Sequence, residues 1–243
     1  MIPMPTRTPA SSIARGAVAL ALALASACAS TPPHAATVAD TGERRDAGER
    51  LRSATAVVES QLSDPDHAVP QAIAKSARCV SIVPAMLHAG VLVGVHRGRG
   101  VVTCRSGDRW STPSFVRVSG SGAGLLAGVE SVDLVMLLMN DESARSLAGA
   151  RVEFGAAGSI AAGPVGRSWQ AATAPSLGAS LLCYSSSRGL FAGISLTEVV
   201  IESDDEAARA FYGDARDFGV LLRGTSAPPP EVAPFLTAMQ RAF

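Results

Sequence analysis

The chain has 243 residues, of which 47% are hydrophobic and 17% are charged, and its formal net charge is +0. This composition excludes an intrinsically disordered chain and provides enough apolar residues for one sizeable core. A chain without net charge has no global field to attract nucleic acid, so we expect no DNA or RNA partner.

The N-terminal segment has the pattern of a secretory signal peptide. Arg7 and Arg15 precede an apolar run, Ala17 to Ala25. This run is too short to span a bilayer, which takes about 20 apolar residues. Small residues then lead directly to a cysteine, which is typical of a cleavage site. We expect residues 1–27 to be a signal peptide and Cys28 to become a lipid anchor. An ordinary cleavage site that leaves a free thiol is the alternative.

Residues 28–48 are rich in proline, alanine, threonine and charge, which favours a flexible tether. From about Glu49 the apolar residues recur at helical spacing, and Pro70 is suited to the first turn of a second, short helix. Residues 49–243 are therefore expected to form one domain. The residues on the apolar face of the first helix are Leu51, Ala54, Val58 and Leu62.

Downstream of Cys79 the pattern becomes strand-like. A hairpin turn is expected at Arg97 to Gly100, a helix from Asn140 to about Gly149, and further helices after Asp204 and from about Val232. The many glycines in the apolar runs indicate bends. The prediction is an α+β fold: a strongly bent antiparallel sheet or barrel-like sandwich, flanked by N- and C-terminal helices. The expected strands are 79–83, 91–95, 101–104, 110–118, 125–129, 132–139, 151–154, 159–162, 180–184, 190–196 and 199–201.

Three cysteines follow Cys28, so at most one internal disulfide can form. Cys79 and Cys104 lie in neighbouring predicted strands and are the candidate pair. The alternative, which the sequence favours, is that these two residues and Cys183 are small buried thiols.

Signatures of catalysis are missing from the sequence. The four histidines have no metal-ligand spacing, and neither a Gly-x-Ser-x-Gly elbow nor a phosphate-binding Walker motif occurs. Residues 122–127 match Gly-x-Gly-x-x-Ala, but an apolar strand-like run follows where a nucleotide-binding helix should begin. We therefore expect no catalytic residue, no metal site, no cofactor and no enzymatic activity. A hydrolase is the remaining alternative, but the sequence offers no pair of residues that can be named as its nucleophile and base.

A set of stretches occurs in a characteristic order along the chain: residues 75–84, 88–94, 99–102, 110–115, 133–140, 161–167, 184–193 and 211–213. Together they resemble the SYLF domain, a lipid-binding family that includes yeast actin-binding members. The resemblance implies a single domain that binds phospholipid headgroups and associates with membranes. In eukaryotic members an N-terminal basic amphipathic segment is linked to phosphoinositide binding, whereas residues 63–83 of this chain contain only two basic residues, which argues against multivalent phosphoinositide specificity.

Two pairs of basic residues are candidates for headgroup binding. Lys75 and Arg78 are three residues apart and would share a helix face, while Arg97 and Arg99 would crowd one hairpin. Guanidinium groups suit bidentate phosphate recognition. The competing interpretation of each pair is a solvated helix face or loop.

The sequence thus predicts a non-catalytic phospholipid-binding lipoprotein of the bacterial cell envelope. Ala29 after the cysteine is not the acidic residue often found in lipoproteins retained at the inner membrane, so we expect the outer membrane, facing the periplasm. A structural or protein-interaction lipoprotein with an envelope protein partner is the alternative. Actin is not an expected partner, because an exported protein would not meet it.

Overall fold

The computed structural model describes residues 33–63, 68–155, 159–162, 179–186, 196–213 and 217–243. The expected signal peptide, the anchor Cys28 and the strand expected at 190–196 lie outside these ranges or almost entirely so. Within the described ranges, no helix is both long enough and apolar enough to cross a membrane.

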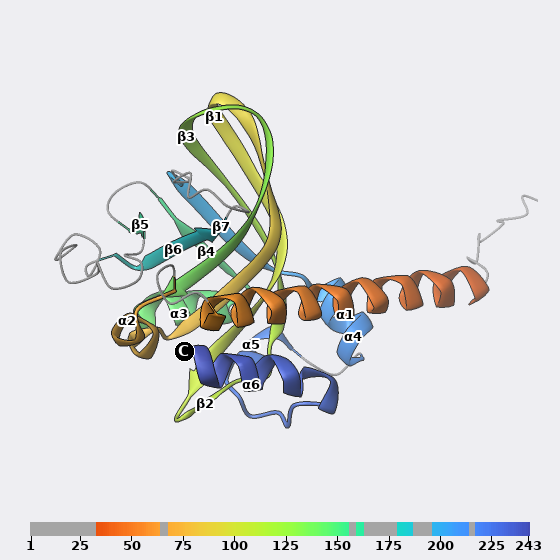
Figure 1. Ribbon diagram of the computed structural model, residues 1–243. Helices are drawn as coiled ribbons and strands as arrows, with labels where there is room; N and C mark the ends of the chain where they lie inside the picture. Colours follow the sequence, from red (N-terminus) through yellow and green to blue (C-terminus); the bar gives the residue numbers. More distant parts are fainter. Residues whose placement is uncertain (1–32, 64–67, 156–158, 163–178, 187–195, 214–216) are drawn as a thin grey trace, which may run out of the picture.

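The fold is organised around one long antiparallel ribbon (Figure 1). Strand β1 (Cys79–Ser106) pairs with strand β3 (Ser114–Leu138) along nearly its whole length. The chain reverses at Gly107, whose φ is 64°, beside the short strand β2 (Arg109–Trp110) that pairs with the end of β1. The hairpin turn expected at Arg97 to Gly100 is therefore wrong, because β1 continues through it.

The glycines of that segment serve a close approach between two parts of β1 and not a turn. Arg97 and Arg99 face outward, so the alternating Gly98 and Gly100 face the inside of the bent ribbon. A Cβ atom on Gly100 would lie 2.2 Å from the carbonyl oxygen of Ile82. Only glycine leaves room for this contact.

The ribbon bends so far that the two ends of β1 meet. The N–H of Arg105 donates to the carbonyl of Arg78 at 2.8 Å, and Cys79 and Cys104 form a disulfide. The sequence had favoured free thiols at these two positions. The pairing register shifts at two places in the ribbon, which marks bulges that sharpen the bend.

The other strands extend the sheet from the edge of β3 that does not pair with β1. Strands β6 (Leu181–Ser186) and β7 (Glu198–Ser203) pair with its two ends, and β4 (Arg151–Phe154) pairs with β7. Strand β5 (Ile160–Ala162) runs parallel to β6, so the seven described strands form a mixed sheet. The expected α+β architecture with a strongly bent, barrel-like sheet is confirmed, apart from this one parallel pair.

The N-terminal helix α1 (Pro33–Ser63) is longer than expected (Figure 1). Residues 33–48, taken as part of a flexible tether, are helical in the structure. This tract contains four alanines and two arginines, which are good helix formers. Packing also begins before Glu49, because Ala47 is fully buried.

The remaining helices are short. In helix α3 (Asp141–Ala148) the Asn140 side chain accepts a hydrogen bond from the N–H of Ser143 at 2.8 Å, which is the helix start that the sequence indicated. Helix α5 (Phe218–Leu222) was not expected. The others are α2 (Gln71–Ser76), α4 (Asp205–Tyr212), the 3₁₀ turn η2 (Pro230–Val232) and α6 (Ala233–Ala242).

Two apolar cores lie on the two faces of the ribbon. On the outer face, Val80, Phe115 and Leu137 pack against helices α1, α4 and α6. On the inner face, residues such as Val83 and Leu134 pack together inside the bend. The helices lie against one end of the ribbon, and its arched end extends beyond them (Figure 1).

Candidate functional site

Arginines form a row across the outer face of the sheet. Arg99 on β1 lies opposite Arg117 on β3 in the strand register. The row continues through Glu202 on β7 to Arg151 on β4. The side chains of Arg99 and Arg117 are 47% and 50% exposed. Arg97 is exposed and, two residues before Arg99, lies on the same face.

The buried carboxylate of Asp204 holds this row in place. Its Oδ2 lies 2.9 Å from Nη1 of Arg50 on α1, and its Oδ1 lies 3.2 Å from Nη1 of Arg117. Arg99 is more distant, with Nε 3.9 Å from Oδ2. Glu43 adds a second carboxylate, 3.8 Å from both Arg50 and Arg99. Around Asp204, three guanidinium groups thus face two carboxylates, which leaves a local excess of one positive charge. Arg151, further along the row, forms ion pairs with Glu153 and Glu202.

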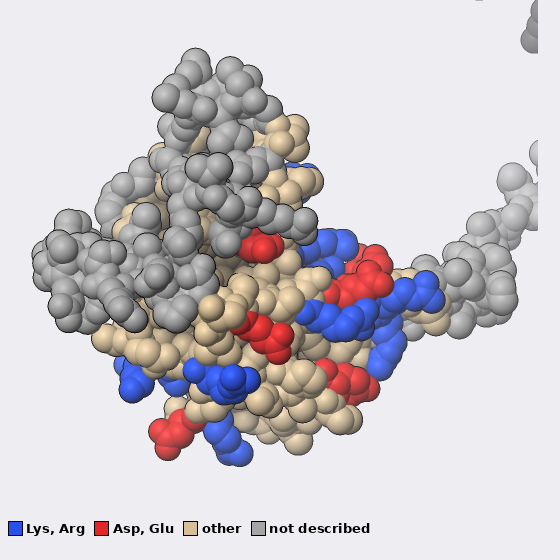
Figure 2. Space-filling view, viewed as in Figure 1, with Lys and Arg blue, Asp and Glu red and all other residues tan. Residues whose placement is uncertain are grey.

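Arg97 adds to that excess, because it has no ion-pair partner within the described ranges. Figure 2 shows positive and negative side chains lying side by side where this region borders α1. The exposed guanidinium groups can donate hydrogen bonds to an anionic oxygen from solvent, as phosphate recognition requires. Arg50, by contrast, is only 8% exposed and is committed to Asp204.

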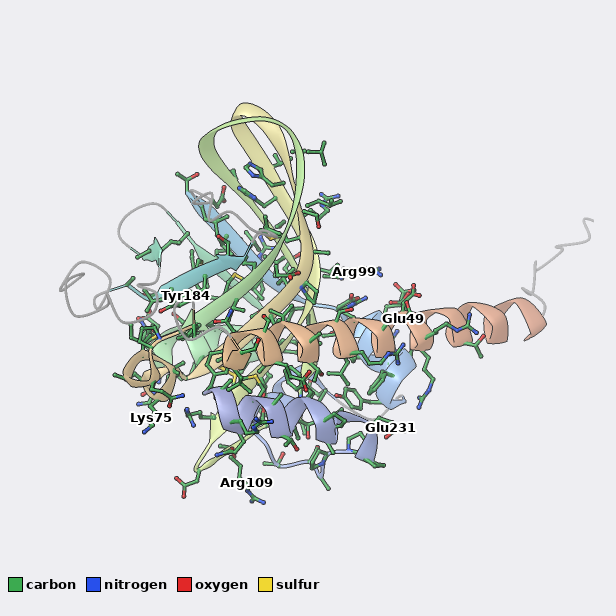
Figure 3. All side chains as sticks on the ribbon, in the orientation of Figure 1. Glu49, Lys75, Arg99, Arg109, Tyr184 and Glu231 are labelled. Carbon is green, nitrogen blue, oxygen red and sulfur yellow. A yellow bond between two sulfur atoms is a disulfide. The ribbon has the colours of Figure 1, made fainter. Side chains whose placement is uncertain are left out.

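The four residues expected to bind headgroups do not form one site. Arg97 and Arg99 lie together in the middle of β1, not at a hairpin tip. Lys75, at the end of α2, lies on the opposite side of the domain from Arg99 (Figure 3). Arg78 forms an ion pair with Asp141 at 2.9 Å. The Lys75 and Arg78 pair is therefore separate from the arginine row and partly neutralised.

Two histidines meet inside the bend of the ribbon. The rings of His88 and His96 have their centroids 4.1 Å apart, and their residues are 5% and 2% exposed. Burial, with a contribution from the neighbouring His88, lowers the pKa of His96 to about 4. His96 is therefore expected to be neutral at neutral pH. No group of three or more potential metal ligands occurs in the part of the chain that the structure describes.

A cavity of about 720 Å³ lies between β2 and α6. Its lining contains one carboxylate, Asp108, but no histidine or cysteine. Two of its hydroxyls already donate to backbone carbonyls, Thr112 to Ser226 and Thr237 to Ala233. The lining therefore offers no paired nucleophile and base of the kind that a hydrolase uses.

The sequence interpretation missed Arg117 and Asp204 as members of the arginine row. Arg117 belongs to it only through the register that places Arg99 opposite it. The sequence predicts Asp204 at the start of a helix, and the structure places it there. Its side chain does not cap α4, however, but accepts a hydrogen bond from Arg50. The alternation of Arg97 and Arg99 with glycines was the available signal for an exposed strand face.

Residues 119–242 match the Ysc84 family, which is described as Las17-binding protein actin regulator. This chain belongs to the SYLF (Ysc84) family. Similar proteins in Saccharomyces cerevisiae are protein YSC84, 37% identical over 206 residues, and LAS seventeen-binding protein 3, 36% identical over 195 residues. A human relative, SH3 domain-containing YSC84-like protein 1, is 33% identical over 189 residues.

These alignments cover 83%, 78% and 76% of this chain but only 43%, 42% and 54% of the respective relatives. The chain thus spans about half the length of these relatives, or less. No solved structure matches it. One of these relatives, LAS seventeen-binding protein 3, is named for binding another protein. The family match includes Arg151 and Asp204 and begins two residues after Arg117.

Proposed function

We propose that this SYLF domain binds the surface of an anionic phospholipid bilayer and catalyses no reaction. The observation that supports the proposal is the local excess of arginine around Asp204, on one part of the outer sheet face. Arg97, Arg99 and Arg117 lie on that face, and the nearby carboxylates of Glu43 and Asp204 do not balance them and Arg50. Each basic residue close to an anionic membrane contributes about 1 kcal/mol to binding.

We further propose that the chain is exported and anchored through an acylated Cys28 at the periplasmic face of the outer membrane. The signal-like N-terminal segment supports export. The disulfide between Cys79 and Cys104 supports it independently, because such bonds persist in oxidising compartments. Labelling cells with a fatty-acid analogue tests the anchor: the chain should take up label, and Cys28→Ser should not. An unlabelled, soluble chain contradicts this part of the proposal.

Vesicle flotation tests the lipid-binding role. The experiment uses the exported chain with Cys28→Ser, which has no thiol at this position to be acylated. Flotation then reports on the lipid binding of the domain alone. This chain should float with vesicles of phosphatidylcholine and phosphatidylglycerol, and less with phosphatidylcholine alone. High salt should weaken the binding, because it screens exposed charges. Binding that ignores both anionic lipid and salt contradicts the arginine mechanism.

A pair of charge variants tests the site itself. Arg97→Gln with Arg99→Gln should lower vesicle affinity by up to about 30-fold, which corresponds to about 2 kcal/mol for two charges. The matched control is Arg145→Gln with Arg241→Gln, which removes two exposed arginines on α3 and α6. The control should bind like the parent chain. Equal losses in both variants would show that net charge matters and the arginine row does not.

The second candidate function is binding to a protein of the envelope. It is motivated by the yeast relative named as a LAS seventeen-binding protein. Crosslinking in intact cells distinguishes the two candidates, since a stoichiometric protein adduct together with no vesicle binding favours this one. Actin is not included, because an exported chain would not encounter it.

A further inference from the structure

Three large hydrophobic side chains are exposed in the described part of the chain, and all three lie at the arched end of the β1–β3 ribbon. Leu87 is 54% exposed, Val95 is 65% exposed and Val129 is 75% exposed. In Figure 1 this arched end rises away from the helices that cover the rest of the outer face. Clustering of exposed apolar side chains marks an interaction surface.

The three side chains share the outer face of the ribbon. Leu87 lies between Met86 and His88, which are buried inside the bend, so it faces outward. Val129 is opposite Ala89 in the register, two residues along from Leu87. Val95 is two residues before Arg97, which is also exposed on the outer face.

The sequence of this end is apolar in both strands. Residues 89–95 and 122–129 contain no charged residue and no serine or threonine. A strand with one face in water ordinarily alternates apolar and polar residues. Here the sequence alternation is lost on both strands at the same level of the ribbon.

We propose that this arched end inserts into the interfacial layer of an anionic phospholipid bilayer, with Leu87, Val95 and Val129 among the acyl chains and Arg97 and Arg99 at the phosphates. The proposal rests on the lipid-binding function above and adds the mode of binding. A bilayer is the proposed partner because Val95 is followed on the same strand face by Arg97 and Arg99, as suits an anionic interface.

The spacing along β1 fits this placement. Residues on one strand face are about 7 Å apart, so Arg97 follows Val95 by about that distance. Interfacial elements place their apolar side about 5–10 Å below the headgroups. An inserted Val95 would therefore hold Arg97 at phosphate level. Glu198 on β7 is opposite Ser121, which is itself opposite Val95, so this carboxylate lies at the level of Val95. It accepts a hydrogen bond from the Ser121 hydroxyl at 3.4 Å. Its charge limits the depth to which this side of the arched end can insert.

The first test changes polarity at constant charge in the Cys28→Ser chain. The triple variant Leu87→Ser, Val95→Ser, Val129→Ser should bind phosphatidylcholine–phosphatidylglycerol vesicles about tenfold or more weakly, because these side chains lose apolar burial. The matched triple Leu87→Met, Val95→Ile, Val129→Ile should bind like the parent. Thermal unfolding of both checks that they are folded.

A second measurement does not depend on losing affinity. Val95→Trp should become strongly quenched when vesicles contain phospholipids with brominated acyl chains. The parent chain gives the background from its own tryptophans. Quenching above that background supports insertion, whereas an unchanged signal in the vesicle-bound variant overturns it.

The outcomes separate this inference from the proposed function. If the parent chain binds vesicles and the serine triple binds equally well, the inference is overturned while lipid binding stands. If the parent does not bind vesicles at all, both fail. If the serine triple changes only the oligomeric state in analytical ultracentrifugation, the arched end contacts a second copy of the chain and the inference is overturned.

Discussion

The carboxylate of Asp204 has no exposed surface and meets guanidinium groups from α1, β1 and β3. A buried charge is tolerated only when it is paired, and its partner depends on it equally. Arg50 is such a partner, because it is 8% exposed and lies 2.9 Å away. This single residue therefore links the N-terminal helix to the arginine face of the sheet.

We expect Asp204→Asn to lower the free energy of unfolding by about 3 kcal/mol, because the buried Arg50 would lose its nearest counter-charge and keep only Glu43 at 3.8 Å. Urea unfolding followed by circular dichroism measures this loss. The control is Asp205→Asn, an exposed neighbour with no ion pair among the described residues, which should change stability little. Equal stability of both variants would show that Arg50 is balanced by another group.

His96 gives the fold a dependence on pH. Its pKa is about 4 in the folded chain and 6.5 when unperturbed, so the unfolded chain takes up the proton first as pH falls. Stability from this residue is therefore complete above pH 6.5 and is lost as pH falls towards 4. The loss is at most about 1.4 kcal/mol per pH unit, and solvent near the bend reduces it.

Thermal unfolding at several pH values measures this effect. The parent chain should lose melting temperature between pH 6.5 and 4, and His96→Gln should lose less over the same interval. His88 is the ring that faces His96, and Glu130 is opposite His88 in the strand register. A variant that follows the parent curve would assign the pH dependence to other groups.

At the scale of elements, the bend of β1 depends on the absence of a side chain at Gly100. We expect Gly100→Ala to cost about 1–3 kcal/mol, because its Cβ would lie 2.2 Å from a backbone oxygen that cannot move aside. Gly155→Ala is the control, since nothing lies within 4 Å of its Cβ position. Denaturant midpoints compare the two. An unchanged midpoint for Gly100→Ala would mean that the ribbon is less tightly bent.

The same contact explains which elements the sequence could predict. Helix α3 was predictable because Asn140 caps it locally, through a bond that spans three residues. The continuity of β1 was not predictable, because Gly98 and Gly100 are explained by close contacts with residues 82–86, which are distant along the chain. Local propensity reads such glycines as a turn. The start of α1 was missed for a similar reason, since tertiary packing contributes to that helix.

At the scale of the whole molecule, a net charge of +0 conceals a local arrangement of charge. The arginine row arises because the register brings Arg117 beside Arg99, while the buried Asp204 offsets only part of their charge. The sequence could identify Arg97 and Arg99 as candidates, but pairing register is a property of the folded sheet. It could not separate them from Lys75, which lies on the other side of the domain (Figure 3).

The disulfide connects whole-molecule stability to the compartment in which the chain folds. Cys79 and Cys104 are separated by 25 residues, and closing a loop of this length stabilises a fold by about 3 kcal/mol. Cys79→Ala with Cys104→Ala should therefore lower the free energy of unfolding by about that amount. Urea unfolding with and without a thiol reductant measures it: the reductant should lower the stability of the parent chain and leave that of the double variant unchanged.

Cys183→Ala is the control, because Cys183 is a free thiol and its removal should leave the response to reductant intact. A parent chain that is equally stable in both conditions would show that the bond adds nothing, and would remove the independent support that it gives to export.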